Sequence, residues 1–150
     1  MNKTLILSLG SRVMSDDAIG HVIVQNLQQK KVKADIIQLD TDIFKLNLFF
    51  DNHKRIIIID AIQSSDSPGT VHVIPFHDFE KEIEGKIRGS HFLDMKEGLE
   101  LLRIANSKIA EAEIFLVGIV IKKIELGTDL TPVLLKKIDE VCNIISDLII

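Results

Sequence analysis

Four consecutive isoleucines followed by an aspartate, at residues 56–60, constrain the fold of this chain more than any other segment. Continuous β-branched residues without polar alternation are typical of strands that are covered on both faces. Such strands occur in parallel sheets that lie between two layers of helices. The run therefore predicts a buried strand over residues 55–60 and favours an α/β protein.

The rest of the chain alternates between strand-like and helix-like segments. The patterns predict further strands over residues 4–9, 34–39 and 113–121, with an edge strand over residues 70–75. They predict helices over residues 16–29, 43–50, 94–105 and 131–149, and a loop over residues 80–90. Thr131 is the expected N-cap of the last helix, and Pro132 its first residue.

This order predicts the fold class α/β: a single three-layer domain over residues 1–150, with a mostly parallel, five-stranded, twisted sheet and helices on both faces. In such sheets, ligands bind beyond the carboxyl ends of the strands. Residues that follow the strands are therefore the ones to search for chemistry.

Composition excludes several classes of protein. The formal net charge of −4 argues against a nucleic-acid partner. No apolar run reaches the length of about 18 residues that a membrane helix needs, and the N-terminal segment lacks a small-residue cleavage site, so we expect no membrane insertion and a cytoplasmic location. Cys142 is the only cysteine, which excludes intrachain disulfides and indicates a buried structural thiol.

Acidic residues follow three of the predicted strands. The pair Asp16-Asp17 comes after the first strand, Asp40 ends the second, and Asp60 ends the isoleucine strand. His91 lies just before a predicted helix. Carboxylates that converge on one rim repel each other, which raises the pKa of one of them, and a bound cation relieves the repulsion. Two carboxylates and an imidazole suit a divalent transition metal.

Each of these residues also has an ordinary structural explanation. Asp16 alone is better explained as a helix cap, and Asp40 as a turn residue. Asp60 is equally compatible with a hydrogen bond to a neighbouring loop. His91 alone is weak evidence, since four other histidines are expected to be surface or structural residues: His21, His53, His72 and His77.

Four blocks, in order along the chain, resemble the maturation endopeptidases of nickel-iron hydrogenases. The first is Leu5-Ile6-Leu7-Ser8-Leu9-Gly10-Ser11 with Asp16-Asp17-Ala18-Ile19-Gly20, and the second is Ile57-Ile58-Ile59-Asp60-Ala61-Ile62 with Ser67-Pro68-Gly69-Thr70-Val71. The third is Ser90-His91, and the fourth is Phe115-Leu116-Val117-Gly118-Ile119 with Leu126-Gly127-Thr128-Asp129-Leu130-Thr131-Pro132. Together they span nearly the whole chain.

The resemblance implies an endopeptidase that recognises the nickel-loaded precursor of a hydrogenase large subunit and removes its C-terminal extension. It implies that Asp17, Asp60 and His91 are the catalytic metal contacts, with Asp16 in support. The nickel would come with the substrate, and no organic cofactor is expected.

Departures from the family pattern concern the first and second strand ends. Ser11 replaces the family's asparagine, Ala18 stands where glycine is usual, and Asp40-Thr41-Asp42 replaces Asp-Gly-Gly-Thr. Asp40 and Thr41 are expected to contact the substrate, and the loss of both glycines alters how closely a peptide backbone can approach. This loop motivates one alternative, a non-catalytic module that only binds the precursor.

A phosphoacceptor receiver domain is the alternative from another class. In such a domain Asp60 would be phosphorylated, Mg²⁺ would bind at Asp16 and Asp17, and Lys122 would contact the phosphate. The spacer between Gly10 and the acidic pair opposes this alternative, and His91 has no role in it.

Overall fold

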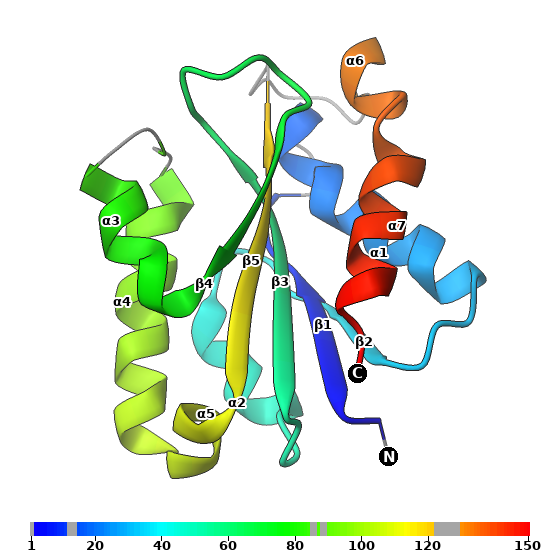
Figure 1. The fold of residues 1–150 in the computed structure, drawn as a ribbon. Coiled ribbons are helices and arrows are strands. Elements are labelled where there is room, and N and C mark those ends of the chain that lie inside the picture. The colour runs from blue at the N-terminus through cyan, green and yellow to red at the C-terminus, as the bar shows by residue number, and fades with distance from the viewer. Residues whose placement is uncertain (1, 12–14, 85–86, 88–89, 122–129) are drawn as a thin grey trace.

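The computed structural model describes residues 2–11, 15–84, 87, 90–121 and 130–150, apart from the side chains of Ser15, Ile83, Glu84, Ser90 and His91. Its centre is a five-stranded sheet with the order β2-β1-β3-β5-β4 (Figure 1). The strands are β1 (Thr4–Ser8), β2 (Asp35–Gln38), β3 (Arg55–Ile62), β4 (Val71–Pro75) and β5 (Glu113–Val120). All pairs are parallel except β4 with β5. The predicted α/β fold and edge strand are confirmed.

Helices cover both faces of the sheet (Figure 1). One layer contains α1 (Ile19–Gln29), α6 (Pro132–Leu135) and α7 (Ile138–Leu148). The other contains α2 (Leu46–Phe49), α3 (Phe79–Glu84), α4 (Ser90–Ala105) and α5 (Ser107–Glu111). Short 3₁₀ turns precede three of these helices: η1 (Ser15–Ala18), η2 (Ile43–Lys45) and η3 (Phe76–Asp78).

The isoleucine strand β3 serves both layers, as its composition predicts. Ile56, Ile58 and Ile62 belong to the core beneath α4. Ile57 and Ile59 belong to the core beneath α1 and α7. Because side chains alternate along a strand, Asp60 takes the α4 side.

One loop prediction and two helix predictions are corrected. Residues 80–90 do not form one loop, because α3 begins at Phe79, which is fully buried and packs edge-on against Phe76 at 5.1 Å between ring centroids. Helix α4 begins at Ser90 rather than residue 94, so His91 lies in a helix and not in a loop. The single helix expected over residues 131–149 is divided into α6 and α7, with a turn at residues 136–137.

A second helix, α5, was likewise not predicted. Its N-cap is Asn106, whose side chain accepts a hydrogen bond from the Lys108 amide at 3.0 Å. This five-residue element fills the short connection between α4 and β5, where hydrophobic periodicity has too few residues to give a signal.

Candidate functional site

Gly10 lies between the carboxyl ends of β2 and β3. Its backbone amide donates to the Asp40 carbonyl at 2.8 Å, and the preceding Leu9 amide donates to the Ile59 carbonyl at 3.0 Å. These bonds bring the segments after β1 and β2 beside Ile59 of β3 at the carboxyl end of the sheet, where ligands bind in such folds.

Asp17 is fixed against this glycine. The Ser11 amide donates to Asp17 Oδ2 at 2.8 Å, and Asp17 is only 4% exposed. Gly10 has a φ of +122°, and a Cβ atom at this position would lie 2.4 Å from the Asp17 carbonyl oxygen. Only glycine fits this backbone and this close approach.

Asp60 is the second buried carboxylate of this edge. It is 2% exposed, and its Oδ1 accepts a hydrogen bond from the Ala61 amide at 2.8 Å. Gly20 brings α1 onto β3, since a Cβ atom there would lie 2.8 Å from the Ile59 carbonyl oxygen. Asp17 is three residues before Gly20 and Asp60 directly follows Ile59, so this contact joins the segments that carry the two acids. Asp60 does not end its strand as predicted, because β3 continues to Ile62 through its pairing with β5.

His91 lies in the first turn of α4, the layer toward which Asp60 points. Its side chain is outside the described part of the structure. Among the side chains that the structure does describe, no three His, Cys, Asp or Glu residues form a group able to hold a metal ion. The approach of His91 to Asp17 and Asp60 thus remains a prediction.

Asp16 does not cap the helix that follows it, contrary to the structural explanation given above. It is fully buried, and its carboxylate accepts hydrogen bonds from the Thr131 amide at 2.8 Å and the Thr131 hydroxyl at 3.1 Å. Ala18 is the N-cap of α1 and makes no side-chain capping bond. Thr131 is the N-cap of α6 as predicted, but its hydroxyl is directed to Asp16.

Asp40 and Thr41 occupy the outer part of the same edge and are exposed. The Asp40 carboxylate pairs with Lys45 at 3.4 Å, whereas its carbonyl accepts from Gly10. The neighbouring Asp42 caps η2 by accepting from the Phe44 amide at 2.9 Å. The two polar residues therefore border the buried acids without being part of that buried group.

His21 supports the site and was not singled out by the sequence. It is buried, with Nδ1 2.6 Å from Ser8 Oγ and Nε2 2.7 Å from the Gly10 carbonyl oxygen. A carbonyl can only accept, so Nε2 donates. The ring thereby holds the end of β1 in place, and no local sequence pattern identifies this role, because its two partners lie 13 and 11 positions away.

Comparison with known proteins identifies the family. Residues 20–148 match the family described as hydrogenase maturation protease. The chain is 32% identical to Protein FrxA of Pyrococcus furiosus over 91% of its length and 97% of the relative's. It is 30% identical to the Hydrogenase 2 maturation protease of Escherichia coli, over 87% and 80% of the two lengths.

Solved structures agree with these relatives. The [NiFe] hydrogenase maturation protease HybD from Thermococcus kodakarensis superposes with a TM-score of 0.90 at 32% identity, covering 99% of both chains. The maturating endopeptidase HybD from E. coli gives a TM-score of 0.78 at 26% identity, covering 95% of this chain and 89% of that one.

These matches decide against the receiver-domain alternative, and Lys122, on which it depends, lies outside the described residues. Within the described part of the chain, no helix has the length and apolar character to span a membrane. The chain belongs to the hydrogenase maturation protease family and is an endopeptidase of that type.

Proposed function

We propose that this endopeptidase recognises the nickel-loaded precursor of a nickel-iron hydrogenase large subunit and removes its C-terminal extension. The observation that carries the proposal is the pair of buried carboxylates, Asp17 and Asp60, each fixed by a backbone amide at one edge of the sheet. Buried carboxylates that are held in place by the backbone offer oxygen ligands of the kind that divalent transition metals accept.

In this proposal Asp17, Asp60 and His91 contact the nickel, which arrives as part of the substrate. Carboxylate oxygens and an imidazole nitrogen are suitable ligands for Ni²⁺. Contact with the metal positions the precursor so that one peptide bond lies at the site. Water then adds to the carbonyl carbon, the C–N bond breaks, and the new amine takes up a proton. Asp16 acts as a positioning residue because it ties η1 to α6.

Asp40 and Thr41 are proposed to contact the precursor near the cut. Their exposure and their position next to Gly10 support this role. We further propose that residues 1–150 act as one functional unit and that the protein works in the cytoplasm.

Cleavage of a nickel-loaded precursor tests the function directly. The purified protein is mixed with the precursor, and the mass of the large subunit is followed by mass spectrometry. We expect the subunit to lose a C-terminal fragment. We expect Asp17→Asn, Asp60→Asn and His91→Ala to reduce the rate by about 10- to 100-fold or more, because even the outer-shell partners of metal ligands cost this much when they are changed.

Matched controls come from the protein surface. Asp139→Asn on α7 and His77→Ala in η3 change exposed residues of the same types, and should cleave at the wild-type rate. Precursor that is bound but never cut by the wild-type protein would favour the non-catalytic module. Full activity in all three site variants would refute the site.

A further inference from the structure

The outer edge of β2 has backbone groups that point away from the sheet. The Leu39 amide donates to the Ser8 carbonyl of β1 at 2.8 Å, so residues 35, 37 and 39 face β1. The amides and carbonyls of Ile36 and Gln38 consequently face outward. Within the described residues, none of these outward groups has a backbone hydrogen bond.

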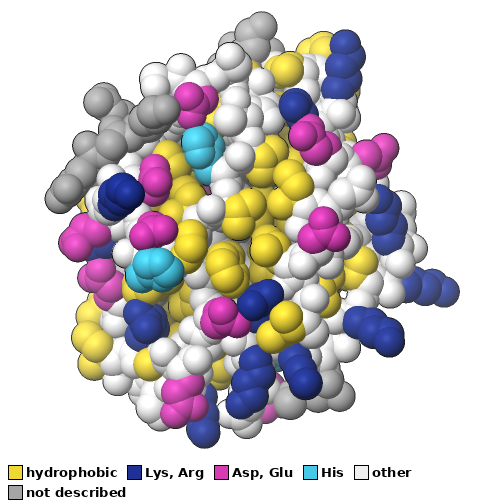
Figure 2. All heavy atoms as spheres, viewed as in Figure 1, with side chains coloured by type: hydrophobic (Ala, Val, Ile, Leu, Met, Phe, Trp, Pro, Cys, Tyr) yellow, Lys and Arg dark blue, Asp and Glu magenta, His cyan; other side chains and the backbone are white. Residues whose placement is uncertain are grey.

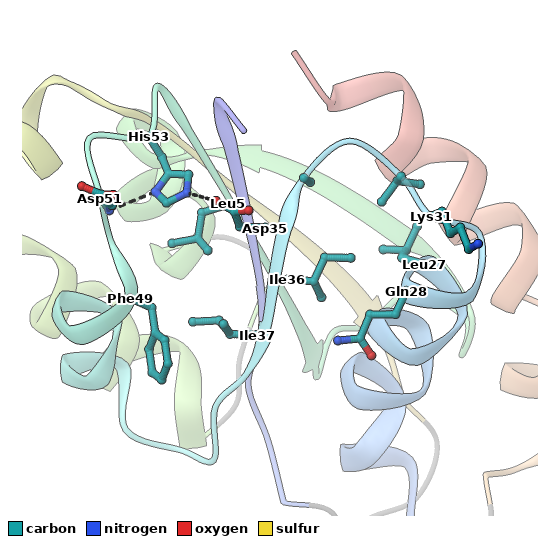
Figure 3. Close-up of a pocket in the computed structure, with 12 residues that line it drawn as sticks. Leu5, Leu27, Gln28, Lys31, Asp35, Ile36, Ile37, Phe49, Asp51 and His53 are labelled. Carbon is teal, nitrogen blue, oxygen red and sulfur yellow. Dashed lines mark hydrogen bonds and ion pairs between the residues drawn. The ribbon is translucent and has the colours of Figure 1, made fainter. Parts of the chain in front are cut away.

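A groove of about 550 Å³ lies beside the first three residues of β2, Asp35 to Ile37. Figure 3 shows its two flanks: Ile37 and Phe49 lie on one side of β2, and Ile36, Leu27 and Gln28 lie on the other. Phe49 is 46% exposed. A free strand edge with apolar side chains on both flanks is the arrangement that binds an extended peptide by strand addition.

The carboxyl end of β2 borders the candidate active site, whereas the groove lies beside the first residues of the strand, Asp35 to Ile37. Strand β2 ends at Gln38, and Asp40 follows it and bonds to Gly10, which contacts Asp17. A strand rises about 3.3 Å per residue. A peptide paired along the four residues of β2 therefore reaches Asp40 and Gly10, at the carboxyl end of the sheet, within a few residues.

We propose that the free edge of β2 binds an extended segment of the hydrogenase precursor next to the cleaved bond, by parallel or antiparallel strand addition. The inference rests on the proposed function, because it names a second contact for the same substrate. The bound segment pairs with the backbone groups of Ile36 and Gln38. Its side chains alternate between the Phe49 flank and the Leu27 flank, so the segment carries apolar residues at alternating positions.

A second copy of this chain is a poorer occupant of the groove. Lys30, Lys31 and Lys33 are exposed beside it, at the end of α1 and before β2. Parallel pairing of β2 with β2 of another copy would bring these like charges together. The strand also has only four residues, which is short for a stable interface between two edges.

A proline substitution tests the strand edge itself. Gln38→Pro removes the outward amide of Gln38 and leaves the bonds to β1, whereas the control Gln38→Ala removes the side chain and keeps the amide. With nickel-loaded precursor, we expect Gln38→Pro to raise KM about tenfold with kcat within about twofold of wild type, the size expected for one or two lost hydrogen bonds. Gln38→Ala should stay within about twofold in both.

Synthetic peptides give a second test that needs no variant. The probe is a peptide of the precursor that spans the cleaved bond, with backbone N-methyl groups at alternate positions. Since only every second amide of a strand faces its neighbour, methylation of one set should weaken binding about tenfold or more, and methylation of the other set should not.

The outcomes separate the two proposals. Precursor that wild type does not cut would refute the proposed function, while the peptides would still test the edge. Cleavage with an unchanged KM in folded Gln38→Pro, or equal binding of both methylated peptides, would refute strand addition and leave the function standing. Sedimentation of a wild-type dimer that Gln38→Pro dissociates, with KM unchanged, would assign the edge to a second copy and likewise overturn the inference.

Discussion

The carboxylate of Asp16 accepts both the amide and the hydroxyl hydrogen of Thr131, at 2.8 and 3.1 Å. The two residues are 115 positions apart, and their contact joins the start of the first helix layer to its last part. We predict that Asp16→Ala lowers the free energy of unfolding by about 2–3 kcal/mol, because hydrogen bonds to a buried charged group are lost and the Thr131 amide keeps no partner there. Urea unfolding measures the change.

Two substitutions at Thr131 separate the contributions to this contact. Thr131→Ser keeps both donors and should stay within about 0.5 kcal/mol of wild type, whereas Thr131→Val keeps the amide alone and should cost about 1 kcal/mol. A variant Asp16→Ala that unfolds at the wild-type urea concentration would contradict the structural role of this pair.

Gly20 sets the distance between α1 and the sheet. A Cβ atom there would lie 2.8 Å from the Ile59 carbonyl oxygen and 3.3 Å from Ser8 Cβ. Alanine is favoured over glycine inside a helix by about 1 kcal/mol, yet we predict that Gly20→Ala destabilises by about 1–3 kcal/mol because the helix must shift. The rate of precursor cleavage should fall by more than the loss of folded protein explains. Helix α1 begins two residues after Asp17, so its shift changes the position of Asp17 relative to Asp60.

An exposed position on the same helix provides the control for Gly20. Gln25→Ala changes a solvent-facing residue of α1 and should leave both stability and activity close to wild type. A gain of stability in Gly20→Ala with unchanged activity would show that the helix can move away from Ile59 without consequence.

The strands were predictable because their signal is local. Long apolar segments such as the isoleucine run in β3, and those of β1 and β5, are stable only when both faces of the strand are buried. Asp60 was predicted as a candidate site residue because it follows such a run. The edge strand β4 followed from its alternation and from Pro75. In these cases a few consecutive residues determine both the element and its place in a sheet.

Contacts between distant segments were not predictable in the same way. Asp16 is of a residue type that often caps helices, and only the folded chain reveals that its partner is Thr131. His21 looks like any histidine on a helix until β1 brings Ser8 and the Gly10 carbonyl to its two ring nitrogens. The start of α4 was misplaced because glycine and charged residues near residue 90 hide a helix that tertiary packing stabilises.

Cys142 provides a further prediction, since it is the only thiol of the chain and is fully buried in α7. Burial raises the pKa of this thiol, and the thiolate is the reactive form. The native protein should therefore react with an aromatic disulfide reagent at least about 100-fold more slowly than a free cysteine does, whereas the urea-unfolded chain should titrate one thiol. Rapid labelling of the native protein would show that α7 opens readily.

Asp35 and His53 give the protein a predictable response to acid. The Asp51 amide donates to His53 Nδ1 at 3.1 Å, so Nε2 carries a proton and donates to Asp35 Oδ2 at 2.6 Å. The hydrogen bond from His53 holds the pKa of Asp35 below its ordinary value of 3.8, and Asn2 adds a second bond. A carboxyl whose pKa is lower in the folded state stabilises the protein above the unfolded pKa, and this contribution is lost as the pH falls through the folded pKa.

Wild-type protein should therefore lose stability below about pH 4, and Asp35→Asn should lose less over the same range because its side chain does not titrate. The side chain of Asp35 is 42% exposed, so solvent screening limits the difference to about 0.5 kcal/mol. Urea unfolding at pH values from about 3 to 7 measures both slopes, with Asp139→Asn on the surface of α7 as the control. Identical pH slopes for wild type and Asp35→Asn would show that the bond from His53 has the same strength to a protonated and an ionised Asp35.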